Sequence, residues 1–381
     1  AGLFNVGIVG FVALGGVAPI LIAMPPTQGA MSAGGWQIIG ALLIALAVIV
    51  TGVKLYQSKQ RIFRMFLLPL VLIVGFFLYR GVFDPAVDAV QSINPAAEGY
   101  LGGLGMPTLI GWPLGAVVAA IAAWFIGKIA LGLRSDYLAI ATLGIGEILV
   151  AVLKNEEWLS RGVMNVNGVP RPWPVPYEIE LQESAQFVER AANLGLDPVT
   201  ASTIYVKLLY TGLFGTVLLL LIWLSQRALH SPWGRMMRAI RDNEVSSAAM
   251  GKDVTRRHLQ IFIIGSAICG LAGAMMVTLD GQMIPSGYNP LRYTFLSWVM
   301  VIVGGSGNNW GAAVGGVLIW YLWIKAEVLG PELMDYLTAF LSEGAFKEHL
   351  IDSAAHMRLL FMGLALLLVL RFSPRGLLPE R

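Results

Sequence analysis

Long apolar runs recur along the whole chain, separated by shorter stretches that hold most of its charges. A membrane-spanning helix needs about 20 mainly apolar residues, each adding roughly 1.5 Å along the axis. About ten segments approach that length, several of them short: 3–23, 36–53, 66–83, 107–127, 136–153, 204–226, 259–280, 290–303, 311–324 and 357–371. The pattern predicts an all-α protein, a polytopic membrane helix bundle in which some hydrophobic segments are short or broken.

The composition supports this prediction. Of the 381 residues, 56% are hydrophobic and 13% are charged, whereas a soluble chain carries roughly 25% charged residues. A soluble domain of this length still exposes about a quarter of its unfolded surface, so this much apolar surface requires lipid. The composition therefore excludes a disordered chain, a nucleic-acid-binding protein and most soluble enzymes.

Charge placement predicts the orientation in the membrane. Basic residues gather in four segments, 54–64, 128–134, 227–257 and the tail from Arg371, while connection 154–203 carries seven acidic residues against four basic ones. Basic connections stay in the cytoplasm, and alternating spans put all four basic segments on one side. We expect a multi-pass protein of the bacterial inner membrane with both termini in the cytoplasm. The first segment has no basic leader and is interrupted by glycines, so we expect that it is not a cleaved secretory signal.

The whole chain, 1–381, is predicted to form a single transmembrane domain with two outer-side additions. In the insert 154–203, the proline-rich stretch 170–176 favours extended backbone, and 179–193 reads as one polar-faced helix that stops near Gly195. In 325–356, apolar and charged residues alternate at helical spacing. We expect this second segment to lie along the membrane interface instead of crossing it.

The basic connection 227–257 carries explicit helix signals. Ser231 can cap a helix that starts at Pro232, and the predicted helix 232–241 has Met236, Met237 and Ile240 on one side. Asp242 and Asn243 break the periodicity and offer a second cap. A short helix, 244–250, then ends at Gly251, the usual left-handed terminator. Two short, capped helices tethered to membrane spans suit insertion into a groove of a soluble partner. The alternative is that this segment is an ordinary basic loop of an inner-membrane protein. Composition alone favours neither interpretation over the other.

Four stretches resemble one known family. Residues 234–251 (GRMMRAIRDNEVSSAAMG) closely resemble the cytoplasmic coupling segment of the membrane permease subunits of branched-chain amino acid ABC importers of the LivM type. Residues 133–147 (LRSDYLAIATLGIGE), 304–316 (GGSGNNWGAAVGG) and 373–377 resemble three further segments of that family. These stretches are distributed over 128–381.

The resemblance implies an ATP-driven importer of branched-chain, hydrophobic amino acids that works by alternating access. An ATP-hydrolysing chain needs the phosphate-binding motif G-x-x-x-x-G-K-[ST], which this sequence lacks. The chain would therefore be a transport subunit and not an enzyme, with ATP and Mg held by separate ABC ATPase subunits. A second, related permease in a heterodimer and a periplasmic substrate-binding protein would complete the importer. The predicted ATPase-coupling residues are Arg235, Arg238, Ala239, Arg241, Asp242, Asn243, Glu244, Ala248 and Gly251.

Four residues are candidates for the substrate pathway. Glu147 lies about ten residues into its span, where a carboxylate costs several kcal/mol unless it faces a cavity or a partner; a packing role, bonded to Thr142 or to nearby backbone, is the alternative. Gly304 and Gly305 interrupt a late apolar run and either line a pore or allow tight helix contact. Asn5 opens an early glycine-rich helix that faintly resembles the family's own.

No cofactor, metal site or catalytic residue is predicted in this chain. The four histidines are scattered, and His349, Asp352 and His356, although spaced as ligands on one helix could be, read as a solvated helix face. Other functions stay open: an ABC permease for urea or short amides, an ATP-independent secondary transporter or channel, or a membrane-embedded enzyme.

Overall fold

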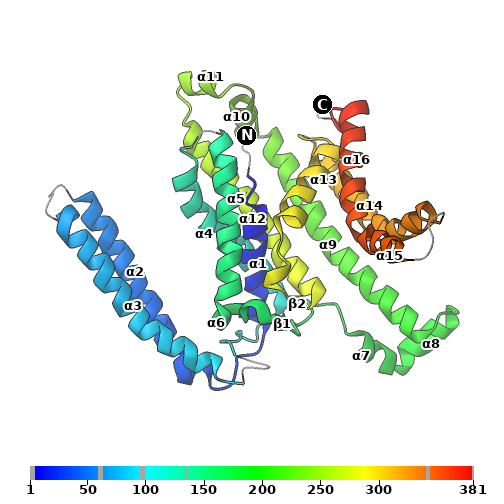
Figure 1. Cartoon of the computed structure of the whole chain (residues 1–381), viewed down its shortest axis with the longest axis horizontal. Coiled ribbons are helices and arrows are strands. Elements are labelled where there is room, and N and C mark those ends of the chain that lie inside the picture. The colour runs from blue at the N-terminus through cyan, green and yellow to red at the C-terminus, as the bar shows by residue number, and fades with distance from the viewer. Residues whose placement is uncertain (1–4, 59–62, 95–98, 134, 340–343, 380–381) are drawn as a thin grey trace. The chain divides into compact units, whose positions relative to one another are not determined.

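The structure is a computed structural model that describes residues 5–58, 63–94, 99–133, 135–339 and 344–379. These residues are mostly helical, with one two-stranded sheet (Figure 1). The predicted helical membrane bundle is confirmed. Several basic residues behind the predicted orientation lie outside the described residues: Lys59, Arg61, Arg134 and Arg381.

Seven helices in the described chain are long and apolar enough to cross a membrane. They are Met31–Gln57 (η1, Met31–Gly35, with α2, Trp36–Gln57), Met65–Gln91 (the end of η2, Phe63–Leu67, with α3, Leu68–Gln91), α4 (Thr108–Ala130), Tyr137–Asn155 within α5 (Ser135–Asn155), α9 (Pro198–His230), α12 (Val254–Asp280) and α14 (Asn309–Leu337). The other three predicted segments are shorter helices: α1 (Ile8–Ala23), η5 with α13 (Leu291–Phe295, Leu296–Gly304) and α16 (Met357–Phe372). All ten predicted segments thus coincide with helices.

The chain separates into two compact units, Leu3–Gly212 with Thr255–Tyr288, and Leu213–Val254 with Asn289–Arg381. The first unit is built around α1, which is buried along most of its length and packs against α4 and α5. Its contacts pass through glycines: a Cβ at Gly15 would overlap the backbone of Gly270 in α12, and a Cβ at Gly273 would overlap the backbone of Val12. Small residues let membrane helices approach this closely, and the resulting van der Waals contact holds them together.

Helices α2 and α3 form a hairpin in the same unit, and Figure 1 shows the two lying side by side. Their contact is built by Ala30, Ile38, Ala41, Phe83, Ala86 and Val90. The other faces of the hairpin expose large apolar side chains such as Leu43, Ile49 and Phe77. Lipid is the solvent that suits such faces.

The connection from α5 to α9 is more divided than predicted. It contains α6 (Glu157–Ser160), η3 (Gly162–Met164), β1 (Val166–Asn167), α7 (Glu178–Glu183) and α8 (Ala185–Asn193). The prediction of one helix over 179–193 is wrong: Ser184 adopts an extended conformation between α7 and α8. Strand β1 pairs antiparallel with β2 (Gln282–Met283), Val166 opposite Met283, and η4 (Pro285–Gly287) follows β2.

The proline-rich stretch 170–176 is not extended throughout, because the amide of Val175 donates to the carbonyl of Pro172 and closes a turn. Arg171 braces this loop: its guanidinium donates to the carbonyl of Pro176 at 2.7 Å and pairs with Glu178 at 2.6 Å. Partial burial of Glu178 raises the pKa of its carboxyl, but the hydrogen bond from Arg171, a backbone hydrogen bond and the charge of Arg171 together outweigh burial and bring the pKa below its ordinary value. The loop is thereby held in one shape.

The second unit pairs α13 with α14 and packs α16 against both. A Cβ at Gly304 would overlap the backbone of Gly311, and Leu296, Val303, Ile319 and Met362 form the core beside this crossing. Helix α14 runs unbroken to Leu337, so the predicted interfacial segment 325–356 begins as part of a spanning helix. Helix α15 (Ala345–Asp352) and η6 (Ser353–His356) complete that segment.

Candidate coupling site

Helix α10 (Pro232–Asp242) forms where the capping residues place it. The Ser231 hydroxyl accepts from the amide of Gly234 at 3.2 Å and donates to the carbonyl of Ala228 at 2.6 Å, which ties the helix start to the end of α9. Proline at the first helical position costs no hydrogen bond. A Cβ at Gly234 would overlap the Ala228 carbonyl, so the tight turn from α9 into α10 requires glycine.

Helix α11 (Glu244–Ala249) is capped at both ends. The Asn243 side chain accepts from the amide of Ser246 at 2.8 Å, while its own amide donates to the carbonyl of Ala239 at 3.0 Å. One residue therefore ends α10 and starts α11. Gly251 has φ +75°, and the amide of Lys252 returns to the carbonyl of Ser247, as in a Schellman termination. The predicted pair of capped helices is confirmed.

The apolar side chains are distributed differently from the prediction. Met237 and Ile240 are 5% and 2% exposed, so the predicted apolar side of α10 is largely buried in the chain. Val245 and Met250, on α11 and at its end, are 80% and 79% exposed. These two residues were not predicted from the sequence. A valine and a methionine within a short segment of otherwise small and polar residues were the available signal.

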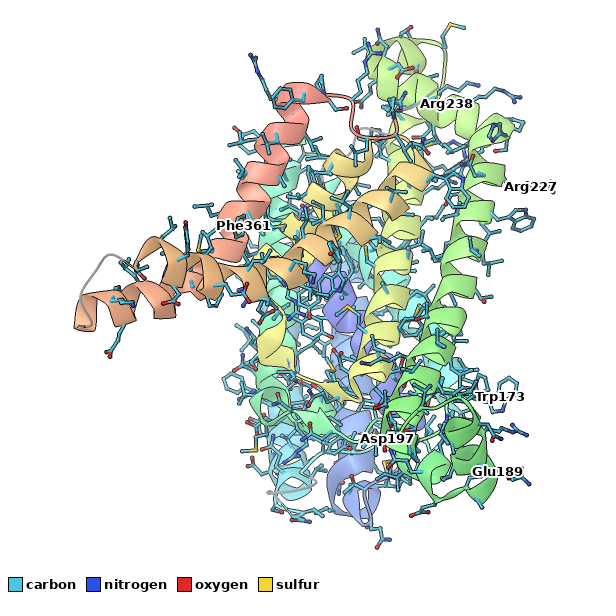
Figure 2. All side chains as sticks on the ribbon, turned by 90° about the vertical axis from the view of Figure 1, so that its right-hand side faces the viewer. Trp173, Glu189, Asp197, Arg227, Arg238 and Phe361 are labelled. Carbon is cyan, nitrogen blue, oxygen red and sulfur yellow. The ribbon has the colours of Figure 1, made fainter. Side chains whose placement is uncertain are left out.

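Two of the three arginines on α10 bond to the end of α9, and the third pairs with the neighbouring aspartate. Arg235 and Arg238 donate to the carbonyls of His230 and Leu229 at the end of α9, at 3.3 and 3.2 Å. Arg241 pairs with Asp242 at 3.1 Å. Figure 2 shows Arg238 beside the end of α9 that carries Arg227. The carbonyls at a helix C-terminus carry partial negative charge, so cations there are stabilising.

The remaining predicted coupling residues form an exposed surface. Ala239, Asp242, Glu244, Ala248 and Gly251 are all exposed. In the described part of the chain the Glu244 carboxylate has no hydrogen bond or ion pair, although it sits at the first position of α11, where an acidic side chain favours the helix. The site thus combines a fixed backbone with one uncommitted carboxylate and two uncovered apolar side chains.

Two of the four predicted pathway residues, Asn5 and Glu147, belong to the first unit, and Gly304 and Gly305 belong to the second. The Asn5 side chain accepts from the amide of Gly7 at 3.0 Å at the start of α1. Glu147 is exposed on α5, next to Gly146, where α5 crosses α1 at Gly7. Gly304 and Gly305 are buried in backbone contact with Gly311 and with the carbonyl of Leu378, so they serve close packing.

Glu147 lacks the contacts that a packing role would give it. Within the described residues its carboxylate has no hydrogen bond or ion pair. Thr142, named above as its alternative partner, accepts instead from the amide of Val6 at 3.0 Å and donates to the carbonyl of Ala139. A carboxylate within a membrane-spanning helix that no described group neutralises needs water, a ligand or another subunit beside it.

In the described residues, no group of three histidine, cysteine, aspartate or glutamate side chains could hold a metal ion. The side chain of Asp352, one of the three residues spaced as metal ligands, lies outside the described residues.

The long apolar helices and the two capped helices between α9 and α12 define a class of protein: a multi-pass helical membrane protein with a rigid, folded connection between two of its spans.

Comparison with known proteins specifies this class. The chain belongs to the family described as branched-chain amino acid transport system / permease component, which it matches over residues 1–370. It is similar to the high-affinity branched-chain amino acid transport system permease proteins LivM of Salmonella typhimurium, at 28% identity over 291 residues, and of Escherichia coli, at 26% over 297 residues. Each match covers 76% of this chain.

A probable branched-chain amino acid transport permease protein LivM of Methanocaldococcus jannaschii is 30% identical over 156 residues, 41% of this chain and 42% of the relative. The matched part spans 61% of the length of each of the two bacterial relatives. No solved structure matches.

Proposed function

We propose that this chain is the transmembrane permease subunit of an ATP-driven importer of branched-chain amino acids. Family membership supports transport, and relatives named as branched-chain amino acid permeases support the cargo. The observation that carries the proposal is the α10–α11 pair, two helices fixed by Ser231, Asn243 and Gly251 between two membrane spans.

The geometry of α10 and α11 suits the transmission of force. The first α10 turns are bonded to the end of α9 through Ser231, Arg235 and Arg238, so a push on α10 is passed to a spanning helix and is not absorbed by a loose loop. Val245 and Met250 offer apolar contact area, and Glu244 offers a charge. Buried apolar anchors and a few specific charges are what a protein–protein interface needs.

In the proposed mechanism, ABC ATPase subunits bind this pair in the cytoplasm. ATP-driven closure of the ATPases moves α10 and α11 as rigid bodies and tilts the attached spans, which switches the open side of the pathway. ATP supplies the free energy because the ATPases bind it differently in the two states, so the permease needs only two stable arrangements. A second permease subunit and a periplasmic binding protein complete the proposed importer, with both termini of this chain in the cytoplasm.

Glu147 is the proposed pathway residue. An amino acid carries an ammonium group, and a carboxylate without a partner among the described residues can receive it at membrane depth. Replacement by Gln should raise the KM for uptake and leave the amount of folded protein unchanged. Glu189→Gln on α8, an exposed carboxylate outside the spans, is the matched control.

Reconstitution tests the function. The chain is placed in liposomes with the ATPase subunits, the second permease and the binding protein, and uptake of labelled leucine is followed with and without ATP. The proposal predicts ATP-dependent uptake that unlabelled valine and isoleucine inhibit. Equal uptake without ATP would identify a secondary transporter or channel, and inhibition by urea or acetamide in place of amino acids would identify an amide permease.

A further inference from the structure

A cavity of about 620 Å³ opens beside α10, wholly within the second unit. Its walls come from the end of α9, from α10, from the loop before α14 and from the C-terminal tail. The lining residues are Gln226, Leu229, His230, Arg238, Gly307, Asn308, Asn309, Trp310, Leu377, Leu378 and Pro379. This volume is within the range of small-molecule sites.

The polar part of the lining is electropositive. Arg238 and His230 are its ionisable residues, and no acidic side chain belongs to the described lining. One Arg238 nitrogen donates to the Leu229 carbonyl, which leaves the other guanidinium donors for a ligand. His230 Nδ1 donates to the Gln226 carbonyl at 2.8 Å, so the imidazolium form of the ring can also donate through Nε2 to an anion.

One further feature of the cavity wall favours an anion. The N-terminus of α14, a helix of 29 residues, borders the cavity through Asn308 and Asn309. The N-terminus of a helix carries partial positive charge, so anionic oxygens are favoured beside it.

The rest of the lining is apolar and partly uncovered. Leu377, Leu378 and Trp310 are exposed. The tail that carries the two leucines is held in place, because the amides of Leu377 and Leu378 donate to the carbonyls of Val303 and Gly304, both at 2.9 Å. A cavity lined by basic side chains and by exposed apolar ones, at the end of a spanning helix, matches a phosphate group that continues into hydrocarbon.

We propose that this cavity binds the phosphate group of an anionic phospholipid through Arg238, His230 and the N-terminus of α14. The lipid's glycerol and upper acyl chains then lie against Leu377, Leu378 and Trp310. A bound lipid would bridge α10, the α13–α14 loop and the tail, so membrane composition would act on the element proposed above to receive force. The proposal concerns ligand binding and holds whichever solute the protein transports.

Lipid titration of the purified full-length chain tests the proposal. The detergent-solubilised chain is titrated with phosphatidylglycerol and, separately, with zwitterionic phosphatidylcholine, and bound lipid is counted by native mass spectrometry. A basic side chain near an anionic lipid contributes about fivefold to affinity, so phosphatidylglycerol should bind at least tenfold more tightly than phosphatidylcholine. Arg238→Gln should reduce this preference about fivefold, and the double variant with His230→Gln should abolish it.

Arg235→Gln is the matched control, because Arg235 lies on the same helix but does not line the cavity. It should keep the preference within twofold, and all variants are compared at equal helix content by circular dichroism. The proposal would be overturned if the native chain bound the two lipids equally. It would also be overturned if Arg235→Gln reduced the lipid preference as much as Arg238→Gln does.

A second arm separates the lipid from a free anion. Inorganic phosphate is titrated into the lipid-free chain, and its binding is followed by the line width of the phosphorus resonance. Suppose that phosphate binds, that Arg238→Gln abolishes this binding, and that the chain shows no preference between the two lipids. This result would overturn the lipid assignment in favour of a free phosphate. Retention of the lipid preference at millimolar phosphate supports the lipid.

Discussion

The region around α1 and the α10–α11 connection use their residues in opposite ways. Around α1, small residues bring backbones into direct contact, and Gly15, Gly270 and Gly273 leave no room for a Cβ. In the connection, hydrogen-bonding caps fix the backbone while most side chains from Arg241 to Asp253 stay exposed. The residues around α1 serve close packing of helices, whereas the side chains of the α10–α11 connection are available to contact a partner. Changes in the two regions should therefore separate folding from coupling.

The largest effect is expected at Gly273 in α12. Gly273→Ala places a methyl group on the backbone of Val12, which neither helix can avoid by rotating a side chain. Overpacking of this kind costs about 1–3 kcal/mol and at times more. We expect loss of most folded protein, measured as monodisperse material by fluorescence-detected size exclusion. A normal yield would show that α1 and α12 do not pack as described.

The connection should give the next largest effect, on transport instead of folding. Gly251→Val forces a β-branched residue into a left-handed conformation and disturbs the end of α11. Glu244→Gln removes the uncommitted carboxylate. Each should lower ATP-driven uptake at least tenfold while membrane insertion and basal ATP hydrolysis persist. Normal uptake in both variants would mean that the ATPase contact is elsewhere.

A smaller, local effect is expected at the cap shared by α10 and α11. Asn243→Ala removes the acceptor for the Ser246 amide, and loss of such a cap costs about 1 kcal/mol. Hydrogen exchange of the Ser246 amide should therefore accelerate about fivefold. The Gly234 amide, capped independently by Ser231, serves as the internal reference and should not change. An unchanged rate at Ser246 would show that the cap does not hold α11.

The smallest effect is expected at Gly40, the matched control for Gly273. No atom lies within 4 Å of a Cβ built at Gly40 of α2. Gly40→Ala should change stability by less than about 1 kcal/mol, in the stabilising direction because alanine favours a helix. Melting of the purified chain followed by tryptophan fluorescence tests this. A loss comparable to that of Gly273→Ala would remove the distinction between packed and open glycines.

The sequence predicted an element well where a specific side chain ends or starts it. Ser231, Asn243 and Gly251 each satisfy backbone groups at a helix end, and those chemical requirements are visible in residue types alone. The break between α7 and α8 was missed because neither glycine nor proline marks it, and a serine at position 184 is compatible with a continuing helix. The length of α14 was missed because charged residues beyond 324 were read as the end of a span.

The composition of the candidate site could be predicted, but its exposure could not. Met237 and Ile240 looked like the apolar contact surface, since periodicity identifies an apolar side without showing what covers it. Likewise, the sequence singled out Gly304 and Gly305 as interruptions, while only the three-dimensional arrangement shows the backbone of Gly311 and Leu378 against them.

Site-specific photo-crosslinking can show whether α11 contacts the ATPase. A photoreactive amino acid is placed at Val245 on α11 and, as a control, at Leu194 after α8, which is similarly exposed at 75%. Both variants are irradiated in cells that express the ATPase subunits. The account predicts that Val245 crosslinks to an ATPase subunit and Leu194 does not. An ATPase adduct from Leu194, or none from Val245 in a complex that still transports, would contradict it.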